Sequence, residues 1–450
     1  MRALLASSIG VACAAALALP FALPAGATAA HPQRAAKPSR VPGSTQSLPL
    51  GPLGASDRAR AAVPQGAAAA GVAARDVKPF SLVGIVWDDA TKVFHGRAQV
   101  RTKDAGTHKW SPWQDIQTHN DDMPDQGSPE RTSGHARGSS APLWVGDSVG
   151  VQVRALGEDA SGRSGPAGLP GGLRIELVNP GDDPEDEEPG SESEAPKGRT
   201  LSPEESASSA VNAEFASMGA TQITPLDKEE TEQEAEEVTG SSGSAAARPY
   251  IGPRPGIVTR AGWGADEKLR EREFLYTKTV KAAFVHHSAT GNYYTCKQVP
   301  AILRSIYRFH VKSSGWRDFG YNFVVDKCGT IYEGRAGGVA RPVMGAHTLG
   351  FNTNTMGIAV LGTYSSSNPP AAAVAGVSKL TAWKLGLFGA NPRGKVALVS
   401  GGSNKYRKGT RVSMNVISGH RDGFVTECPG ARLYGKLGST RSTSAKLQGR

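Results

Sequence analysis

The clearest alternation of apolar and polar positions falls between residues 79 and 180. Short apolar runs there are separated by turn residues, which is the pattern of half-buried strands. The runs cover residues 80–87, 93–101, 149–154 and 173–178. We therefore predict a small all-β, sandwich-like domain over residues 79–180. Its tryptophans fit either a buried core or a face that stacks on sugars.

A second folded unit is predicted over residues 250–437, where strand and helix patterns alternate. Apolar runs of strand length lie at residues 280–286, 322–326, 330–332 and 356–361. Residues 297–311 and 371–387 instead carry apolar positions at helical spacing. Alternation of the two patterns predicts an α/β domain.

The remaining segments lack a sustained apolar pattern. Residues 31–78 are rich in Ala, Pro, Gly and Ser, and we predict a disordered leader. Residues 181–248 are predicted to be an acidic disordered linker, with a short helix allowed near 203–218. Within it, residues 181–240 hold 18 acidic and 3 basic residues, too charged to bury a core. Residues 438–450 are predicted to be a tail.

The N-terminus has the pattern of a secretory signal over residues 1–30. Arg2 is followed by an apolar run at residues 11–23 and by small residues at 27–30. A membrane anchor is the alternative, although the run is short for a bilayer span and contains Pro20. We expect a protein that is secreted, extracellular or cell-wall located, monomeric, and not stably inserted in a membrane after cleavage.

Composition supports separate compact domains, because Gly and Pro make up 85 of 450 residues and aromatics only 6%. Charge is uneven: residues 241–450 hold 30 basic and 9 acidic residues, a net charge of +21. A strongly basic exported domain favours a polyanionic partner. Anionic cell-wall polymers fit that partner better than nucleic acid does, and simple solubility is the alternative.

Three residues are candidate metal ligands: His286, His420 and Cys428. His286 ends an apolar strand, and seven residues separate His420 from Cys428, enough for the chain to loop back. Two imidazoles and a thiolate suit Zn²⁺, and three protein ligands leave a fourth position for water. By spacing alone, a structural histidine pair remains an alternative.

An ordered set of motifs extends this hypothesis across residues 255–437. The motifs are Thr-Arg-Ala-Gly-Trp-Gly at 259–264, Val-His-His-Ser-Ala at 285–289, Gly-Tyr-Asn-Phe-Val-Val at 320–325, Gly-Thr-Ile-Tyr-Glu-Gly-Arg at 329–335, Gly-Ala-His-Thr-Leu-Gly-Phe-Asn at 345–352, Gly-His-Arg-Asp at 419–422 and Thr-Glu-Cys-Pro-Gly at 426–430. The set resembles the peptidoglycan-recognition-protein and type 2 N-acetylmuramoyl-L-alanine amidase family. Within that family, the expected pairing of Cys296 with Cys328 differs from the closely spaced disulfide of animal members and places the chain nearer bacterial, secreted members.

The resemblance implies a mixed central β-sheet flanked by helices, a Zn²⁺ cofactor, and peptidoglycan as substrate. It implies that His286, His420 and Cys428 hold zinc, and that Tyr321 and Thr426 are active-site residues. The implied reaction is hydrolysis of the amide between the lactyl group of muramic acid and L-alanine. Tyr321 is the candidate donor to the developing oxyanion. The general base stays open.

Further residues are assigned by the same resemblance. His347 and Asn352 match a loop that lines the substrate groove, and His287 and Arg335 are candidate substrate contacts. A structural histidine and an exposed arginine are the alternatives for the last two.

The cysteine count fits this reading, because Cys13 leaves with the signal. With Cys428 on zinc, Cys296 and Cys328 form the expected disulfide of an exported domain. Two rival functions remain: a wall-binding protein without turnover, and an unrelated zinc hydrolase. The second lacks support, because the sequence has neither a His-Glu-x-x-His helix nor a Gly-x-Ser-x-Gly elbow.

Overall fold

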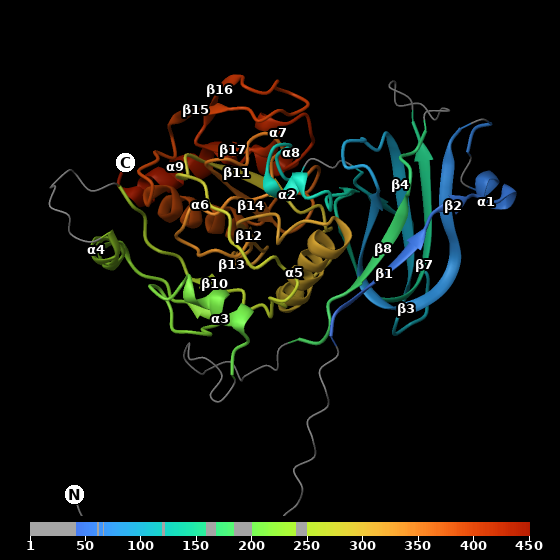
Figure 1. Ribbon diagram of the computed structural model, residues 1–450, viewed down its shortest axis with the longest axis horizontal. Coiled ribbons are helices and arrows are strands. Elements are labelled where there is room, and N and C mark those ends of the chain that lie inside the picture. The colour runs from blue at the N-terminus through green and yellow to red at the C-terminus, as the bar shows by residue number, and fades with distance from the viewer. Residues whose placement is uncertain are drawn as a thin grey trace, which may run out of the picture. The chain divides into compact units, whose positions relative to one another are not determined.

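The N-terminal domain is one antiparallel sheet in this computed structural model, which describes residues 42–60, 63–65, 67–118, 122–158, 168–183, 200–239 and 250–450. The order is β1-β8-β3-β7-β4-β5, and β2 and β6 also pair with β3 (Figure 1). The strands are β1 (Ser44–Pro49), β2 (Gly51–Pro52), β3 (Ala69–Trp87), β4 (Gly96–Asp104), β5 (Gln114–Ile116), β6 (Gly138–Ser139), β7 (Leu143–Gly157) and β8 (Arg174–Asn179). Two short helices, α1 (Ala55–Arg60) and α2 (Pro129–Thr132), lie between strands. The predicted all-β domain is confirmed.

The long strands β3 and β7 organise this domain. Their pairing shifts register three times, and such irregularities bend a sheet and increase its twist. One set of inward side chains, including Phe80, Ile85 and Trp87, forms a single apolar core. Trp110 and Trp113 are instead half-buried, and Arg101 lies over both rings.

The predicted disordered leader is wrong from residue 42 onward. β1, β2 and the first half of β3 all lie within residues 31–78. β1 owes its order to a partner distant in sequence, since Ser44–Pro49 pairs along its whole length with β8. Its own sequence has little apolar pattern, which is why local reasoning missed it. The predicted signal at residues 1–30 lies outside the described residues.

The second domain contains the expected mixed sheet, with strand order β17-β11-β14-β12-β13-β10-β9. β11, β14, β12 and β17 run parallel, while β13 is antiparallel to β12. The strands are β9 (Gln222–Ile223), β10 (Ile257–Val258), β11 (Ala282–His287), β12 (Phe323–Val325), β13 (Ile331–Glu333), β14 (Thr355–Val360) and β17 (Ile417–Gly419). A separate hairpin pairs β15 (Lys395–Val399) with β16 (Arg411–Asn415).

Helices cover both faces of this sheet (Figure 1). They are α5 (Val299–Arg308), which continues as a π-helical turn (Phe309–Ser313), α6 (Ala371–Gly386), α7 (His420–Gly423), α8 (Ala431–Tyr434) and α9 (Leu437–Gln448). Residues of α6 and α9 share a core with Phe323 and Val325 of β12. Val324 faces the other way and packs with α5, as strand alternation requires. Among the described residues, no helix has both the length and the apolar content needed to span a bilayer.

The predicted tail at residues 438–450 is wrong, because α9 belongs to the core. Ser444 and Thr381 of α6 approach to 2.8 Å through their hydroxyls, and Gln448 donates to the Ala382 carbonyl. Small and polar residues on α9 allow this close approach, so the segment carries no strong apolar stripe.

The acidic linker is also more ordered than predicted. α3 (Pro203–Ala210) begins at a capping box formed by Ser202 and Glu205, and α4 (Lys228–Thr239) follows. Between them, β9 pairs with β10 and extends the sheet. Side-chain and backbone partners in the second domain therefore order this charged segment. Residues 184–199 and 240–249 lie outside the described residues.

The two domains share an apolar core. Leu82, Val86 and Val178 of the N-terminal sheet cluster with Ile306 and Phe309 from α5 and its π-helical extension. Gly84 makes this contact fit, because a Cβ atom there would lie 2.4 Å from the Phe309 ring.

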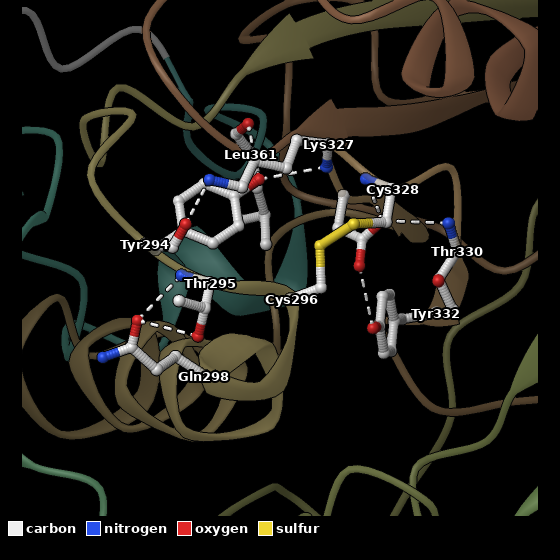
Figure 2. The surroundings of a disulfide bond; sticks show 10 residues. Tyr294, Thr295, Cys296, Gln298, Lys327, Cys328, Thr330, Tyr332 and Leu361 are labelled. Carbon is white, nitrogen blue, oxygen red and sulfur yellow. Dashed lines mark hydrogen bonds between the residues drawn. A yellow bond between two sulfur atoms is a disulfide. The ribbon is translucent and has the colours of Figure 1, made fainter.

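The expected disulfide joins Cys296 to Cys328, whose Cα atoms are 6.5 Å apart. Cys296 starts a short 3-10 helix (Cys296–Gln298) before α5, and Cys328 lies in the turn between β12 and β13. Figure 2 shows Tyr294 and Lys327 beside the bond; the Lys327 backbone N–H donates to the Tyr294 hydroxyl. The disulfide thus ties a helix start to a strand turn.

Candidate active site

His286 and His420 meet at the carboxyl ends of two adjacent parallel strands. β11 and β17 pair with Val285 opposite Gly419, and the next residue along each segment is a histidine: His286 in β11, and His420 at the start of α7. Their ring centroids lie 4.4 Å apart. In α/β sheets this edge is where ligands bind.

Cys428 completes the predicted ligand set. One ligand atom from each of His286, His420 and Cys428 lies within 4.8 Å of the others. The Cys428 sulfur is 3.7 Å from His286 Nδ1, and all three side chains are buried. Because Cys428 takes no part in the disulfide, its thiolate is available to a metal. Two imidazole nitrogens and one thiolate fit Zn²⁺.

Backbone hydrogen bonds shape the loop that returns Cys428 to the two histidines. The Arg421 N–H donates to the Cys428 carbonyl at 3.0 Å. Thr426, a predicted active-site residue, accepts a hydrogen bond from the Cys428 N–H at 3.1 Å. Thr426 therefore helps to position the cysteine.

Thr348 is a site residue that sequence reasoning missed. Its hydroxyl lies 3.3 Å from His286 Nε2 and 3.0 Å from His347 Nδ1. A partner on Nε2 favours the tautomer that presents Nδ1 to a metal, and it fixes the ring orientation. The motif match at residues 345–352 contains Thr348, but nothing in the sequence shows that it contacts His286.

Tyr321, a predicted active-site residue, lies beside His286. Its ring centroid is 5.3 Å from that of His286, and the side chain is 4% exposed. Burial raises the pKa of Tyr321 well above its usual value, and nearby Asp122 and Cys428 act in the same direction. The phenol is therefore a proton donor at neutral pH.

Asp122 is the second residue that sequence reasoning missed, and it comes from the N-terminal domain. Its Oδ1 atom lies 3.0 Å from His286 Nδ1 and 3.3 Å from His420 Nδ1. Its Oδ2 atom accepts a 2.6 Å hydrogen bond from Tyr321. Burial alone would raise the pKa of Asp122, but His286 and His420 outweigh burial and hold it well below its usual range.

His347 lies beside His286, with ring centroids 5.4 Å apart, and Asn352 holds the loop that carries it. The Asn352 side-chain oxygen accepts from the backbone N–H groups of His347 and Thr348. Its amide nitrogen donates to the Met123 carbonyl and to Asp125. Burial lowers the pKa of His347 well below its usual value, so its ring is neutral.

Arg335 and His287 are placed differently from a simple groove wall. Arg335 is buried and bound to Glu130 of the N-terminal domain. His287 is buried, accepts a hydrogen bond from the Tyr364 N–H, and has its pKa lowered by burial to about 4. Both residues therefore have partners within the protein.

Comparison with known proteins matches the two domains separately. Residues 32–190 match the family described as "Rv3811 N-terminal galactose-binding domain-like". Residues 276–431 match the family described as "N-acetylmuramoyl-L-alanine amidase".

Similar proteins match about two fifths of the chain. Peptidoglycan-recognition protein SC2 of Drosophila simulans is 31% identical over 182 residues, which are 40% of this chain and 84% of that protein. The human N-acetylmuramoyl-L-alanine amidase is 31% identical over 188 residues, which are 41% of this chain and 28% of that protein. The solved Drosophila PGRP-LB is 25% identical with a TM-score of 0.33, covering 41% of this chain and 92% of that one. By its identity to the first of these relatives over most of that protein's length, this chain belongs to the family of peptidoglycan-recognition proteins and N-acetylmuramoyl-L-alanine amidases.

Proposed function

We propose that this protein is a zinc-dependent amidase that hydrolyses the bond between the lactyl group of muramic acid and L-alanine in peptidoglycan. The observation that carries the proposal is the buried convergence of His286, His420 and Cys428. Family members that only bind the wall have no need of a complete nitrogen and sulfur ligand set. The net charge of +21 over residues 241–450 suits an anionic wall partner.

The chain's own residues supply positioning and proton donation. A zinc ion, when bound, would polarise the amide carbonyl and lower the pKa of water. Thr348 and Thr426 orient His286 and Cys428, so the ligand atoms are held before the substrate arrives. Tyr321 is positioned to donate a hydrogen bond to the oxyanion that forms from the carbonyl oxygen.

Neither glutamate near the motifs is placed to act as a general base. Glu333 is buried and accepts hydrogen bonds from Asn212. Glu427 is 76% exposed and lies 3.5 Å from Arg421. The carboxylate beside Tyr321 is that of Asp122, which has a different role, argued below.

The substrate lies outside the plasma membrane, so the proposal includes export. The signal predicted at residues 1–30 would provide it, and the Cys296–Cys328 disulfide is consistent with an oxidising compartment.

The test is digestion of purified peptidoglycan by the full chain, followed by mass spectrometry of the released peptides. We expect free stem peptides with an N-terminal L-alanine, and loss of release with a chelator. Cys428→Ser should lower the rate by more than roughly 100-fold, while Val399→Ser, on an exposed position of β15, should not change it.

Two results would overturn the proposal. One is an absence of new amino termini from both the full chain and a variant without the Asp122 carboxylate, with binding to insoluble peptidoglycan retained. That result would identify a wall-binding protein instead. The other is unchanged release by Cys428→Ser.

A further inference from the structure

A segment of the N-terminal domain leaves its own sheet and lies against the second domain. We call residues 122–137, which precede β6 and include α2, the inserted segment. At its far end, the Arg137 N–H donates to the Ser314 carbonyl at 2.9 Å. Gly315 is required there, because its φ is +71° and a Cβ atom would lie 1.9 Å from the His135 carbonyl oxygen.

Met123 anchors the near end of the inserted segment. Its side chain is 2% exposed and packs with Trp316, Ala346, Leu349 and Phe424. All four partners belong to the second domain, and Phe424 lies in the loop between His420 and Cys428. This contact is buried and apolar and lies beside the candidate ligands, so the inserted segment packs against the second domain.

Three carboxylates of the inserted segment engage Arg335, Asn352 and Tyr321, which the resemblance assigned to substrate contact or to the active site. Glu130 binds Arg335 and accepts from the Arg317 N–H at 3.0 Å. Asp125 accepts from the Gly350 N–H at 2.6 Å and from the Asn352 amide at 2.8 Å. Asp122 accepts from Tyr321 at 2.6 Å. These candidate contacts are therefore already occupied by the inserted segment.

The Asp122 Oδ1 atom lies at ligand-to-ligand distance from both histidines. In a tetrahedral zinc site with bonds of about 2.0–2.1 Å, nitrogen and oxygen ligand atoms lie about 3.3 Å apart. Oδ1 is 3.0 Å from His286 Nδ1 and 3.3 Å from His420 Nδ1. These separations match those between two ligands of one ion.

We propose that Asp122 is a fourth protein ligand to the zinc ion, and that the inserted segment closes the substrate groove until it is displaced. The groove in question is the one that the proposed amidase function requires. Four protein ligands are the mark of a closed, structural zinc site, and three are the mark of a catalytic one. The N-terminal domain therefore acts as an intramolecular inhibitor, and peptidoglycan must compete with its carboxylates.

The first experiment reads the metal directly, without turnover. The full chain is loaded with Co²⁺, and its visible spectrum is recorded with and without acetohydroxamate, which binds an open metal position. We expect no change on adding acetohydroxamate to the wild type and a clear change with Asp122→Ala. The variant should also bind Zn²⁺ at least roughly tenfold more weakly in competition with a chromophoric chelator. Asp115→Ala, an exposed carboxylate of β5, is the matched control and should behave as the wild type.

The second experiment reads access to the groove. Asp122→Ala, and separately Met123→Ser, should increase the initial rate of peptide release by roughly tenfold or more, because the apparent affinity for substrate scales with the fraction of open molecules. Met123→Ser keeps all four ligands, so it tests docking even where Asp122→Ala folds poorly. Circular dichroism of each variant checks that the fold is retained.

The outcomes separate this proposal from the amidase function. The assignment of Asp122 as the fourth ligand would be wrong if acetohydroxamate changed the wild-type Co²⁺ spectrum as strongly as that of Asp122→Ala. Loss of release in Asp122→Ala, with an unchanged metal spectrum, would overturn it as well and identify Asp122 as the general base. If Asp122→Ala alters the Co²⁺ spectrum as expected but no variant releases peptides, the assignment of Asp122 as a ligand stands and the proposed amidase function is wrong.

Discussion

The guanidinium of Arg335 holds both carboxylate oxygens of Glu130, at 2.8 and 3.0 Å, across the boundary between the two domains. Both side chains are at least 95% buried. A planar, bidentate pair of this kind is geometrically specific, and it leaves no room for the solvation of either charge.

We expect Glu130→Ala to lower the free energy of unfolding by about 3 kcal/mol, because it leaves a buried guanidinium without its partner. The measurement is the urea midpoint, monitored by tryptophan fluorescence. Adding Arg335→Met should restore much of the loss, since it removes the stranded charge. A single variant as stable as the wild type would show that Arg335 is solvated and the contact is weak.

The Thr348 hydroxyl gives a prediction on metal affinity. Thr348→Val should weaken Zn²⁺ binding roughly 10–100-fold, because His286 loses the partner that fixes its ring and tautomer. Thr348→Ser keeps the hydroxyl and should retain affinity. Competition with a chromophoric chelator measures both. Equal affinities for the Val and Ser variants would mean that packing alone orients His286.

Glu333 gives a prediction on pH. Burial raises its pKa from 4.5 to about 7, although hydrogen bonds from Asn212 and the charge of Arg260 act in the opposite direction. The folded state therefore binds a proton more tightly than the unfolded state does. The contribution of Glu333 to the free energy of unfolding is fully present below about pH 4.5. It is lost as the pH rises to about 7, which lowers the free energy of unfolding by about 3 kcal/mol.

Glu333→Gln should flatten this part of the stability profile, because the amide does not titrate. Thermal unfolding at several pH values between 4.5 and 7.5 measures the slope. Glu427→Gln, on an exposed glutamate, serves as the control and should retain the wild-type slope. If the stability of Glu333→Gln changed with pH as steeply as that of the wild type, Glu333 would not be the group that causes the slope.

Gly84 gives a prediction on packing between the domains. Gly84→Ala should cost about 1–3 kcal/mol, because its Cβ would overlap the Phe309 ring. Gly51→Ala in β2 meets no atom within 4 Å and should change stability by less than about 0.5 kcal/mol. Chemical denaturation of the two variants side by side tests the pair. Equal stabilities would mean that Phe309 moves aside at no cost.

The sequence predicted those parts of the molecule whose signals are local. α5 and β11 follow from apolar spacing, and their bounds in the structure lie close to those expected. His286, His420 and Cys428 follow from an ordered set of motifs, and the structure brings them together.

What the sequence did not predict depends on partners distant along the chain. β1 is ordered by pairing with β8, and α9 by hydroxyl contacts with α6. Asp122 lies in an acidic, turn-like stretch without a motif, 164 residues before His286. The role proposed for Asp122 depends on a contact between the two domains, and no periodicity within one segment of the chain indicates such a contact.

The apolar core shared by the two domains has a practical consequence for handling the protein. Residues 250–450 expressed alone would lack the N-terminal part of this core and would uncover apolar side chains such as Phe309, whose ring packs against Gly84. Exposed patches of this kind drive self-association. In a truncated protein, a change in activity could come from removal of the inserted segment or from aggregation. Point substitutions in the full chain therefore test the inserted segment more directly.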